Sequence, residues 1–154
     1  ERAFSMMMQV AGRSGRREEG KVLIQTYDKD NYVFKLLIEH DYNSFIYQQM
    51  KERKEFNYPP YTKLISITLK HKKSKKLDLF AEQLSTQLRN SFGNRVLGPE
   101  YPYISRIRDY YHKDILLKIE RGSSFTKAKE IIKAIINRLK EDKGFRSSRI
   151  VIDI

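Results

Sequence analysis

Apolar and polar residues alternate along residues 62–71, TKLISITLKH, and a period of two predicts a β-strand. Residues 74–93 instead carry apolar side chains every three or four positions, which predicts an amphipathic helix. Ser74 is expected to cap the start of this helix, and Gly93 is expected to end it. Residues 123–144 repeat the helical spacing, so they predict a second helix.

Three shorter apolar runs complete the pattern of this half of the chain. Residues 103–109 and 114–120 predict two strands, with DYYHK at or near the turn between them, and residues 148–154 predict a last strand. The resulting order is strand, helix, strand, strand, helix, strand. This is the split βαβ or ferredoxin-like plan, an α+β fold in which one antiparallel sheet carries both helices on one face.

The front of the chain shows a helix–strand–helix pattern. Apolar residues between positions 4 and 11 have helical spacing, and glycines follow. Residues 21–27, KVLIQTY, form a branched apolar run that predicts a buried strand. A long apolar stripe then predicts one helix that is capped by Asp30 or Asn31 and stopped by Pro59. We therefore expect parts at residues 1–30, 31–57 and 58–154.

The chain is strongly basic. The 154 residues include 31 Lys and Arg against 19 Asp and Glu, for a net charge of +12. Such an excess favours polyanion partners, above all nucleic acid, although a piece of a larger protein with acidic parts elsewhere would show it too. The chain contains no cysteine, which fits the cytoplasm, and its scattered histidines predict no metal site. No apolar run approaches the length of a membrane span.

The sequence QVAGRSGR near the front places two arginines three residues apart on a glycine-punctuated turn. Arg13 and Arg16 can point at one anion, and the planar guanidinium is suited to phosphate oxygens. Gln9 lies on the preceding helix, where it could orient a water or contact a nucleotide. The alternative is a basic turn that only ends a helix. The chain contains no phosphate-binding loop and no nucleophile motif, so alone it is not expected to run a reaction.

Two further basic segments are candidates for nucleic-acid contact. The run KHKKSKK suits phosphate contact, and the segment RIRDYYHK interleaves cations with aromatics that could stack on exposed bases. For each segment the alternative is equally weighted: a solvated turn for the first, and packing or shielding tyrosines for the second. The predicted DNA-binding residues are Lys70, Lys72, Lys73, Lys75, Lys76, Arg106, Arg108, Tyr110, Tyr111 and Lys113.

Several of these strings together resemble one family. QVAGRSGR is similar to motif VI of superfamily-two helicases, Q-x-x-G-R-x-G-R. ERAFSMMMQVAGRSGR, NYPPYTKL, LGPEYPYISRIRDYYHKDILLKI and SRIVIDI resemble, in order, segments of the primosomal replication-restart DNA helicases. The resemblance covers essentially the whole chain, from motif VI onward.

The resemblance implies a parent that is an ATP-dependent 3′ to 5′ DNA helicase, which restarts stalled replication forks through primosome assembly. Arg16 would then be the arginine finger, Arg13 a γ-phosphate contact and Gln9 a third motif residue. The parent would bind ATP and Mg²⁺, and zinc upstream of Glu1. The fragment itself is expected to be inactive and to hold no cofactor, as if cut just before its motif. Residues 1–30 would be the tail of its second helicase lobe, residues 31–57 a connecting helix, and residues 58–154 a C-terminal ferredoxin-like domain that resembles a ribosomal small-subunit protein.

The same resemblance implies partners: forked or single-stranded DNA, single-stranded DNA-binding protein and primosome proteins, with no membrane. A different class stays open beside it. The chain could be a non-catalytic adaptor that binds an acidic tail, such as that of single-stranded DNA-binding protein. The candidate surface for such a partner is the basic second helix, with Lys127, Lys129 and Lys133.

Overall fold

A computed structural model describes residues 1–14 and 20–153 of the chain. The chain divides into two compact units, Glu1–Glu55 and Phe56–Ile154, and each is described by itself. The three-part division at residues 1–30, 31–57 and 58–154 stays a prediction.

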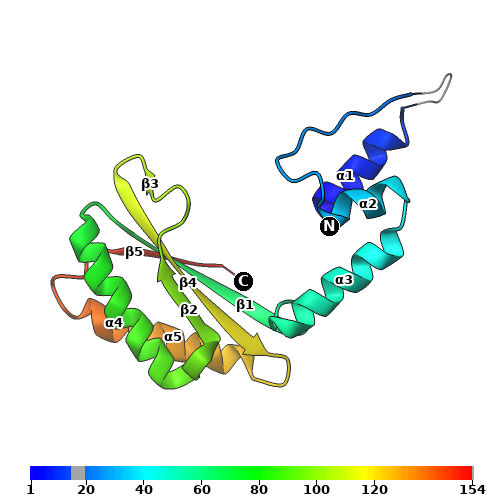
Figure 1. Cartoon of the computed structure of the whole chain (residues 1–154). Helices are drawn as coiled ribbons and strands as arrows, with labels where there is room; N and C mark the ends of the chain where they lie inside the picture. Colours follow the sequence, from blue (N-terminus) through cyan, green and yellow to red (C-terminus); the bar gives the residue numbers. More distant parts are fainter. Residues whose placement is uncertain (15–19, 154) are drawn as a thin grey trace. The chain divides into compact units, whose positions relative to one another are not determined.

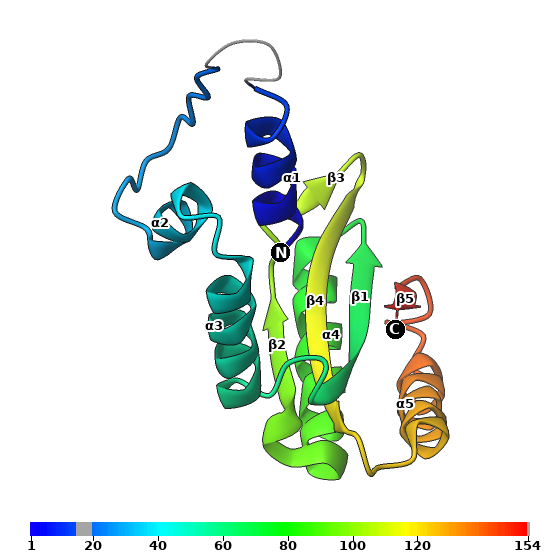
Figure 2. The same cartoon turned by 90° about the vertical axis from the view of Figure 1, so that its right-hand side faces the viewer.

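The second unit is an open antiparallel sheet with two helices on one face (Figure 1). The strands lie in the order β2-β4-β1-β5, and a two-residue strand, β3, pairs with β4 beside this path. Figure 2 shows β2, β4 and β1 side by side in front of α4. This arrangement confirms the predicted α+β, ferredoxin-like fold class. The elements are β1 (Thr62–His71), α4 (Ser74–Phe92), a 3-10 turn (Gly93–Arg95), β2 (Val96–Glu100), β3 (Arg106–Ile107), β4 (Tyr110–Glu120), α5 (Phe125–Lys140) and β5 (Arg149–Asp153).

The core of this unit lies between the sheet and the two helices. Alternate residues of β1 and β4 face the helices, and these positions exclude solvent because side chains of a strand alternate between its two faces. The strand side contributes Ile65, Ile67, Leu69, Val96, Ile115, Leu117 and Ile119, and the helix side contributes Leu77, Phe80, Ala81, Leu84, Leu88, Phe92, Ala128, Ile132, Ile136 and Leu139. The strand predicted at residues 62–71 is confirmed, with its apolar side inward.

The strand predicted at residues 103–109 is largely wrong. Only β3 is extended there, and the strand that follows α4 in the sheet is β2, which pairs Val96 with Leu117. Burial explains the choice, because Val96 is 4% exposed in the core whereas Tyr103 is fully exposed. The turn before β4 is at Arg108, which has a φ of 55°, so Tyr110 to Lys113 lie in β4 and not in the turn.

The start of α4 and the end of the second helix differ from the predicted positions. Ser74 is the first helical residue of α4, and Lys73 occupies the cap position without a side-chain hydrogen bond. Gly93 does end α4, with a φ of 63° that favours glycine. The second helix ends at Lys140, before Gly144, and its start is capped by Ser124, which accepts from the Lys127 amide.

In the first unit, the described residues form a small helical bundle of α1 (Arg2–Ala11), α2 (Tyr32–Ile38) and α3 (Tyr42–Glu55). Its core is the buried set Phe4, Leu36, Leu37 and Phe45. The rings of Phe4 and Phe45 stack with centroids 4.2 Å apart, so α1 and α3 are held by an aromatic pair.

The single helix predicted after residue 31 is wrong, because the chain turns between α2 and α3. His40 has a φ of 55°, which interrupts helical geometry, and the Asp41 carboxylate then accepts from the Ser44 amide at 2.9 Å and starts α3. Of the two predicted caps for α2, Asn31 serves, since its Oδ1 accepts from the Val33 amide at 3.1 Å.

The strand predicted at residues 21–27 is also wrong. These residues form no strand and are exposed, with Leu23 at 96% and Ile24 at 42%. A β-strand is stable only when a neighbouring strand pairs with it, and no described residue pairs with this segment.

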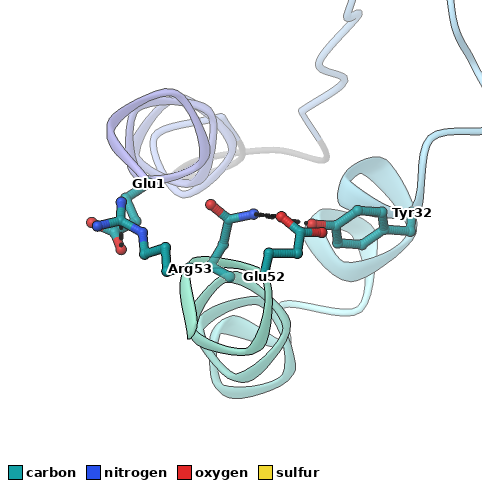
Figure 3. A network of polar contacts seen from close by, with 5 residues as sticks. Glu1, Tyr32, Glu52 and Arg53 are labelled. Atoms are coloured by element: carbon teal, nitrogen blue, oxygen red, sulfur yellow. Dashed lines mark hydrogen bonds and ion pairs between the residues drawn. The ribbon is translucent and has the colours of Figure 1, made fainter. Parts of the chain in front are cut away.

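Polar contacts also link the helices of the first unit (Figure 3). The Gln49 amide donates to the Tyr32 hydroxyl at 3.2 Å and to the Glu52 carboxylate at 3.2 Å, joining α3 to α2. The Arg53 guanidinium lies 3.4 Å from the Glu1 carboxylate, joining α3 to the start of α1.

Candidate nucleic-acid interface

Basic residues lie at the end of the sheet where β1 stops and α4 begins. Figure 1 shows where this junction lies in the second unit. Antiparallel pairing of β1 with β5 places Arg149 opposite Lys70, and pairing of β1 with β4 places Tyr111 opposite His71. The lysine run after β1 therefore meets the start of β4 and the start of β5, although these segments lie far apart in the sequence.

A cavity of about 420 Å³ opens at this end. Four cations converge on it, three from the lysine run after β1 and one from the start of β5, and none of the four forms an ion pair with a carboxylate in the described part of the chain. Like charges repel one another, so a cluster of cations without carboxylate partners favours the binding of an anion in the cavity. The lining residues are His71, Lys72, Lys73, Lys76, Tyr110, Ser147 and Arg149.

The two tyrosines of the hairpin differ in their surroundings. The ring of Tyr110 has the Arg149 guanidinium 4.6 Å and the Lys72 ammonium 5.8 Å from its centroid. Tyr111 packs against the core, and the Arg106 guanidinium lies 5.2 Å from its ring centroid. Both rings are therefore cation–π partners of basic side chains, whereas a base-stacking role for them stays a prediction.

Three other predicted DNA-binding residues lie at the same end but do not line the cavity. Lys70 is half-buried on the sheet face away from the helices, opposite His112. Burial lowers the pKa of His112, and the charge of Lys70 lowers it further against the opposing effect of Asp114. Lys75 is exposed in the first turn of α4, and Arg108 is exposed at the turn between β3 and β4.

Lys113 is placed differently from the rest of the set. It is 8% exposed, and its ammonium forms an ion pair of 2.8 Å with Asp78 on α4. The same ammonium lies 4.7 Å from the ring centroid of Tyr101. The structure therefore engages Lys113 within the fold and does not bring it to the cavity.

The lysines predicted to bind a partner lie on α5. Lys127 and Lys133 are exposed, and Lys129 is half-buried with its ammonium 4.9 Å from the ring centroid of Phe125. A cavity of about 170 Å³ is lined by Lys129, Ile132, Lys133 and Ile152. This surface combines positive charge with an apolar floor.

The motif at the front lies at the end of α1. Gln9 is exposed in the last turn of this helix, and Arg13 is exposed directly after it, with its amide donating to the Val10 carbonyl at 3.1 Å. Arg16 lies outside the described residues. The structure places Gln9 and Arg13 close together in the chain at one helix end, and their role at a nucleotide stays a prediction.

Three lining residues of the basic cavity, His71, Ser147 and Arg149, are absent from the predicted DNA-binding set, although His71 lies inside the predicted run KHKKSKK. Arg149 is the first residue of β5 and Ser147 lies in the turn just before it, and nothing in their local sequence marks a binding residue. The signal that could have found them is the fold plan itself, because a ferredoxin-like sheet pairs its last strand with its first.

The fold and the cavity together define a ferredoxin-like domain with a cationic end. The chain belongs to the family described as "Primosomal protein N C-terminal domain", whose profile matches residues 54–154. The resemblance to the primosomal replication-restart family is thereby confirmed.

Curated relatives agree with this assignment. The chain is similar to replication restart protein PriA of Bacillus subtilis, with 33% identity over 157 residues that cover 100% of this chain and 19% of the relative. The chain is also similar to the PriA proteins of Thermotoga maritima, with 31% identity over 77% of this chain, and of Treponema pallidum, with 29% identity over 94% of this chain. The chain spans about a fifth of the length of these relatives, at 19%, 16% and 22%.

None of the helices at residues 1–14 and 20–153 has both the length and the apolar character that crossing a bilayer requires. Within the same ranges, no group of three or more His, Asp or Glu side chains is arranged to hold a metal ion.

Proposed function

We propose that this chain is the C-terminal part of an ATP-dependent 3′ to 5′ DNA helicase that restarts stalled replication forks through primosome assembly. Membership of the primosomal family and the replication restart names of the relatives support the proposal. The sequence QVAGRSGR supports the helicase part, because it fits the pattern of a helicase motif.

Within that protein, the second unit binds DNA through the basic end of its sheet. The observation that carries this proposal is the convergence of Lys72, Lys73, Lys76 and Arg149 on one cavity without a carboxylate partner among the described residues. Binding is by backbone charge and hardly by sequence, because no element of this surface is built to enter a major groove. Lys70, Lys75, Arg106 and Arg108 extend the positive surface around the cavity.

A salt titration tests this surface. Replacing Lys72, Lys73, Lys75 and Lys76 together with Ala should weaken DNA binding and flatten its salt dependence, by up to about 0.9 units of slope per lost phosphate contact on duplex. The matched control replaces Lys21, Lys29, Lys35 and Lys51, exposed lysines of the first unit, and removes the same charge. Equal slopes for the two variants would refute the assigned surface.

The front motif contributes to ATP hydrolysis in the parent protein. Arg16 stabilises charge on the transferred phosphoryl group, Arg13 contacts the γ-phosphate, and Gln9 orients a water or contacts the nucleotide. The parent binds ATP and Mg²⁺ through its other segments, and zinc at a separate site. The isolated chain should show no DNA-stimulated ATPase activity above a mock purification, since its arginines need a nucleotide that another segment holds.

The finger assignment is tested in the longer protein. Changing Arg16 to Ala should lower turnover by on the order of 10³-fold and change nucleotide affinity far less, because the group acts mainly on the transition state. Equal ATPase rates for the variant and the parent would contradict this role.

A second function is favoured by the cavity on α5. Lys129 and Lys133 flank the apolar side chains of Ile132 and Ile152, and this combination suits an acidic peptide that ends in an apolar residue, such as the tail of single-stranded DNA-binding protein. Lys127 adds charge on the same helix. DNA and an acidic tail would then use different surfaces of one unit.

Competition separates the two functions. A fluorescent acidic peptide with an apolar end should bind the chain, and changing Lys129 and Lys133 to Gln should weaken that binding while DNA affinity stays unchanged. Two results together would contradict a separate partner surface. DNA would displace the peptide at moderate salt, and replacing Lys72, Lys73, Lys75 and Lys76 would weaken peptide binding as much as DNA binding.

A further inference from the structure

His71 is held in one hydrogen-bonding state at the rim of the basic cavity. Its Nδ1 lies 2.8 Å from the Lys73 amide nitrogen and 3.0 Å from the Lys73 carbonyl oxygen. The two contacts exclude each other, and because an amide N–H can only donate, Nδ1 is the acceptor. Nε2 is therefore the ring nitrogen that donates, and it lies 3.0 Å from the Ser147 hydroxyl oxygen.

This arrangement determines what Ser147 can offer to the cavity. A hydroxyl has one proton to donate, and its oxygen already accepts from His71. No described group accepts the hydroxyl proton of Ser147, so the proton is free to bind an acceptor that enters the cavity. His71 is 5% exposed, which makes it a rigid support for this donor.

Tyr110 gives the cavity its second fixed feature. The Arg149 guanidinium and the Lys72 ammonium both lie within cation–π distance of its ring, at 4.6 Å and 5.8 Å. The ring thus lies near two cations that form no ion pair with a carboxylate of the described residues. In this geometry Tyr110 positions the cations, and at least part of its ring surface is covered by them.

We propose that the cavity is a binding site for one phosphate group, with Arg149 and Ser147 as its directional donors, Lys72, Lys73 and Lys76 as its charge, and Tyr110 and His71 as positioning residues. The inference deepens the proposed DNA binding and rests on it for the source of the phosphate. Arginine and hydroxyl donors suit phosphate oxygens because a guanidinium offers a planar fork and a hydroxyl offers one short bond.

Two sources share this chemistry: a phosphodiester within a DNA strand and a phosphate monoester at a strand end. A monoester carries more negative charge than a diester, and the four cations around the cavity can accept either. Oligonucleotides with a 5′-phosphate and with a 5′-hydroxyl distinguish them.

The first measurement uses inorganic phosphate and no DNA. In nitrogen-15 NMR spectra of the 154-residue chain, phosphate should shift the amide signals of Lys73, Ser147 and Arg149, whereas chloride at equal ionic strength should not. The shifts should be lost in Arg149→Gln and kept in Arg146→Gln, a control that removes an exposed arginine from the turn that precedes β5. Signals that stay in place with phosphate would overturn the site, whatever DNA does.

The second measurement uses DNA and separates this inference from the function on which it rests. Arg149→Gln should weaken binding by about tenfold and Ser147→Ala by less, since the Arg149 donor is itself charged whereas the Ser147 donor is neutral. Arg149→Gln should also lower the salt slope by about 0.9 on duplex and about 0.7 on single strands. A larger effect of Arg149→Gln on the 5′-phosphorylated strand assigns the monoester, and equal effects on both strands assign the diester.

Tyr110 variants test the positioning role. Tyr110→Phe should keep binding, and Tyr110→Leu should weaken duplex and single strands alike while lowering the salt slope, because it releases the cations. If the wild-type chain binds DNA but Arg149→Gln has the same DNA affinity and salt slope as Arg146→Gln, the phosphate site is overturned. The proposed DNA binding then stands. If the wild-type chain binds no DNA, the proposed function fails. The NMR titration with inorganic phosphate still shows whether the cavity binds phosphate.

Discussion

Lys113 and Asp78 form an ion pair of 2.8 Å that joins β4 to α4. The Tyr101 hydroxyl donates to the same carboxylate at 2.8 Å, so one aspartate fastens the loop after β2 as well. The hydrogen bond from Lys113 holds the pKa of Asp78 below its ordinary value, and the bond from Tyr101 adds to this against the effect of burial. Burial first, and the Asp78 contact second, raise the pKa of Tyr101 to about 12.

This network predicts an acid-dependent loss of stability. Because the folded-state pKa of Asp78 is lowered, its contribution is complete above the ordinary value of 3.8 and is lost as the pH falls through the lower folded value. The Asp78 side chain is 42% exposed, so the contribution is about 1 kcal/mol or less. In urea unfolding, Asp78→Asn should be less stable than wild type at pH 7, and the difference should shrink below pH 3.8. A constant difference at both pH values would contradict the pairing, and Glu82→Gln on the same helix is the charge control.

Gly98 should tolerate no side chain. It has a φ of 87°, and a Cβ there would lie 2.6 Å from the Asp114 carbonyl oxygen, whereas Gly122 has no heavy atom within 4 Å of such a Cβ. We expect Gly98→Ala to lower the free energy of unfolding by more than about 1 kcal/mol, since both strain and a clash arise. Gly122→Ala should be neutral or stabilising. Denaturant midpoints that rank the two variants in the opposite order would contradict this geometry.

Adjacent serines should respond in opposite directions. The Ser148 hydroxyl is buried without a hydrogen-bond partner among the described groups, so Ser148→Ala should raise the free energy of unfolding by about 1 kcal/mol. Ser147→Ala should lower it, because the Nε2–H of buried His71 loses its acceptor. Thermal unfolding of both variants decides the matter, and a destabilised Ser148→Ala would show that its hydroxyl is satisfied by water.

Residues 22–26 should exchange their amide hydrogens fast. Val22, Leu23 and Ile24 are exposed and lie outside any strand, whereas Ile65 to Leu69 lie in the central strand of the sheet. Hydrogen exchange at several dilutions should show protection only in the second segment. Protection of residues 22–26 that falls on dilution would mean that the segment pairs with a second copy.

The sequence predicted best where burial alone decides the structure. β1 was found at its observed bounds because Ile65, Ile67 and Leu69 alternate with polar residues and face the helices. Residues 21–27 have a strand-like pattern as well, but they form no strand. A strand also needs a partner strand beside it, and the local sequence does not show whether one is present. The break at His40 was missed for a similar reason, since a positive φ in a non-glycine residue leaves no mark on the apolar stripe.

The candidate site was predicted in part. The lysine run and Tyr110 could be found because cations and aromatics stand together in the sequence. Arg149 and Ser147 could not, because only the pairing of β1 with β5 brings them to the cavity. Lys113 had the same sequence signal as its neighbours, but alternation along β4 turns it toward α4 and Asp78.

The order of the strands has a consequence for biosynthesis. The central strand β1 ends at His71, but one of its two partners, β5, ends at Asp153, which leaves 82 residues to be made in between. At about 5–20 residues per second, a ribosome needs roughly 4–16 s for that stretch. Throughout this interval one edge of β1 has no partner, so newly made chains are most exposed to mispairing with one another before β5 emerges.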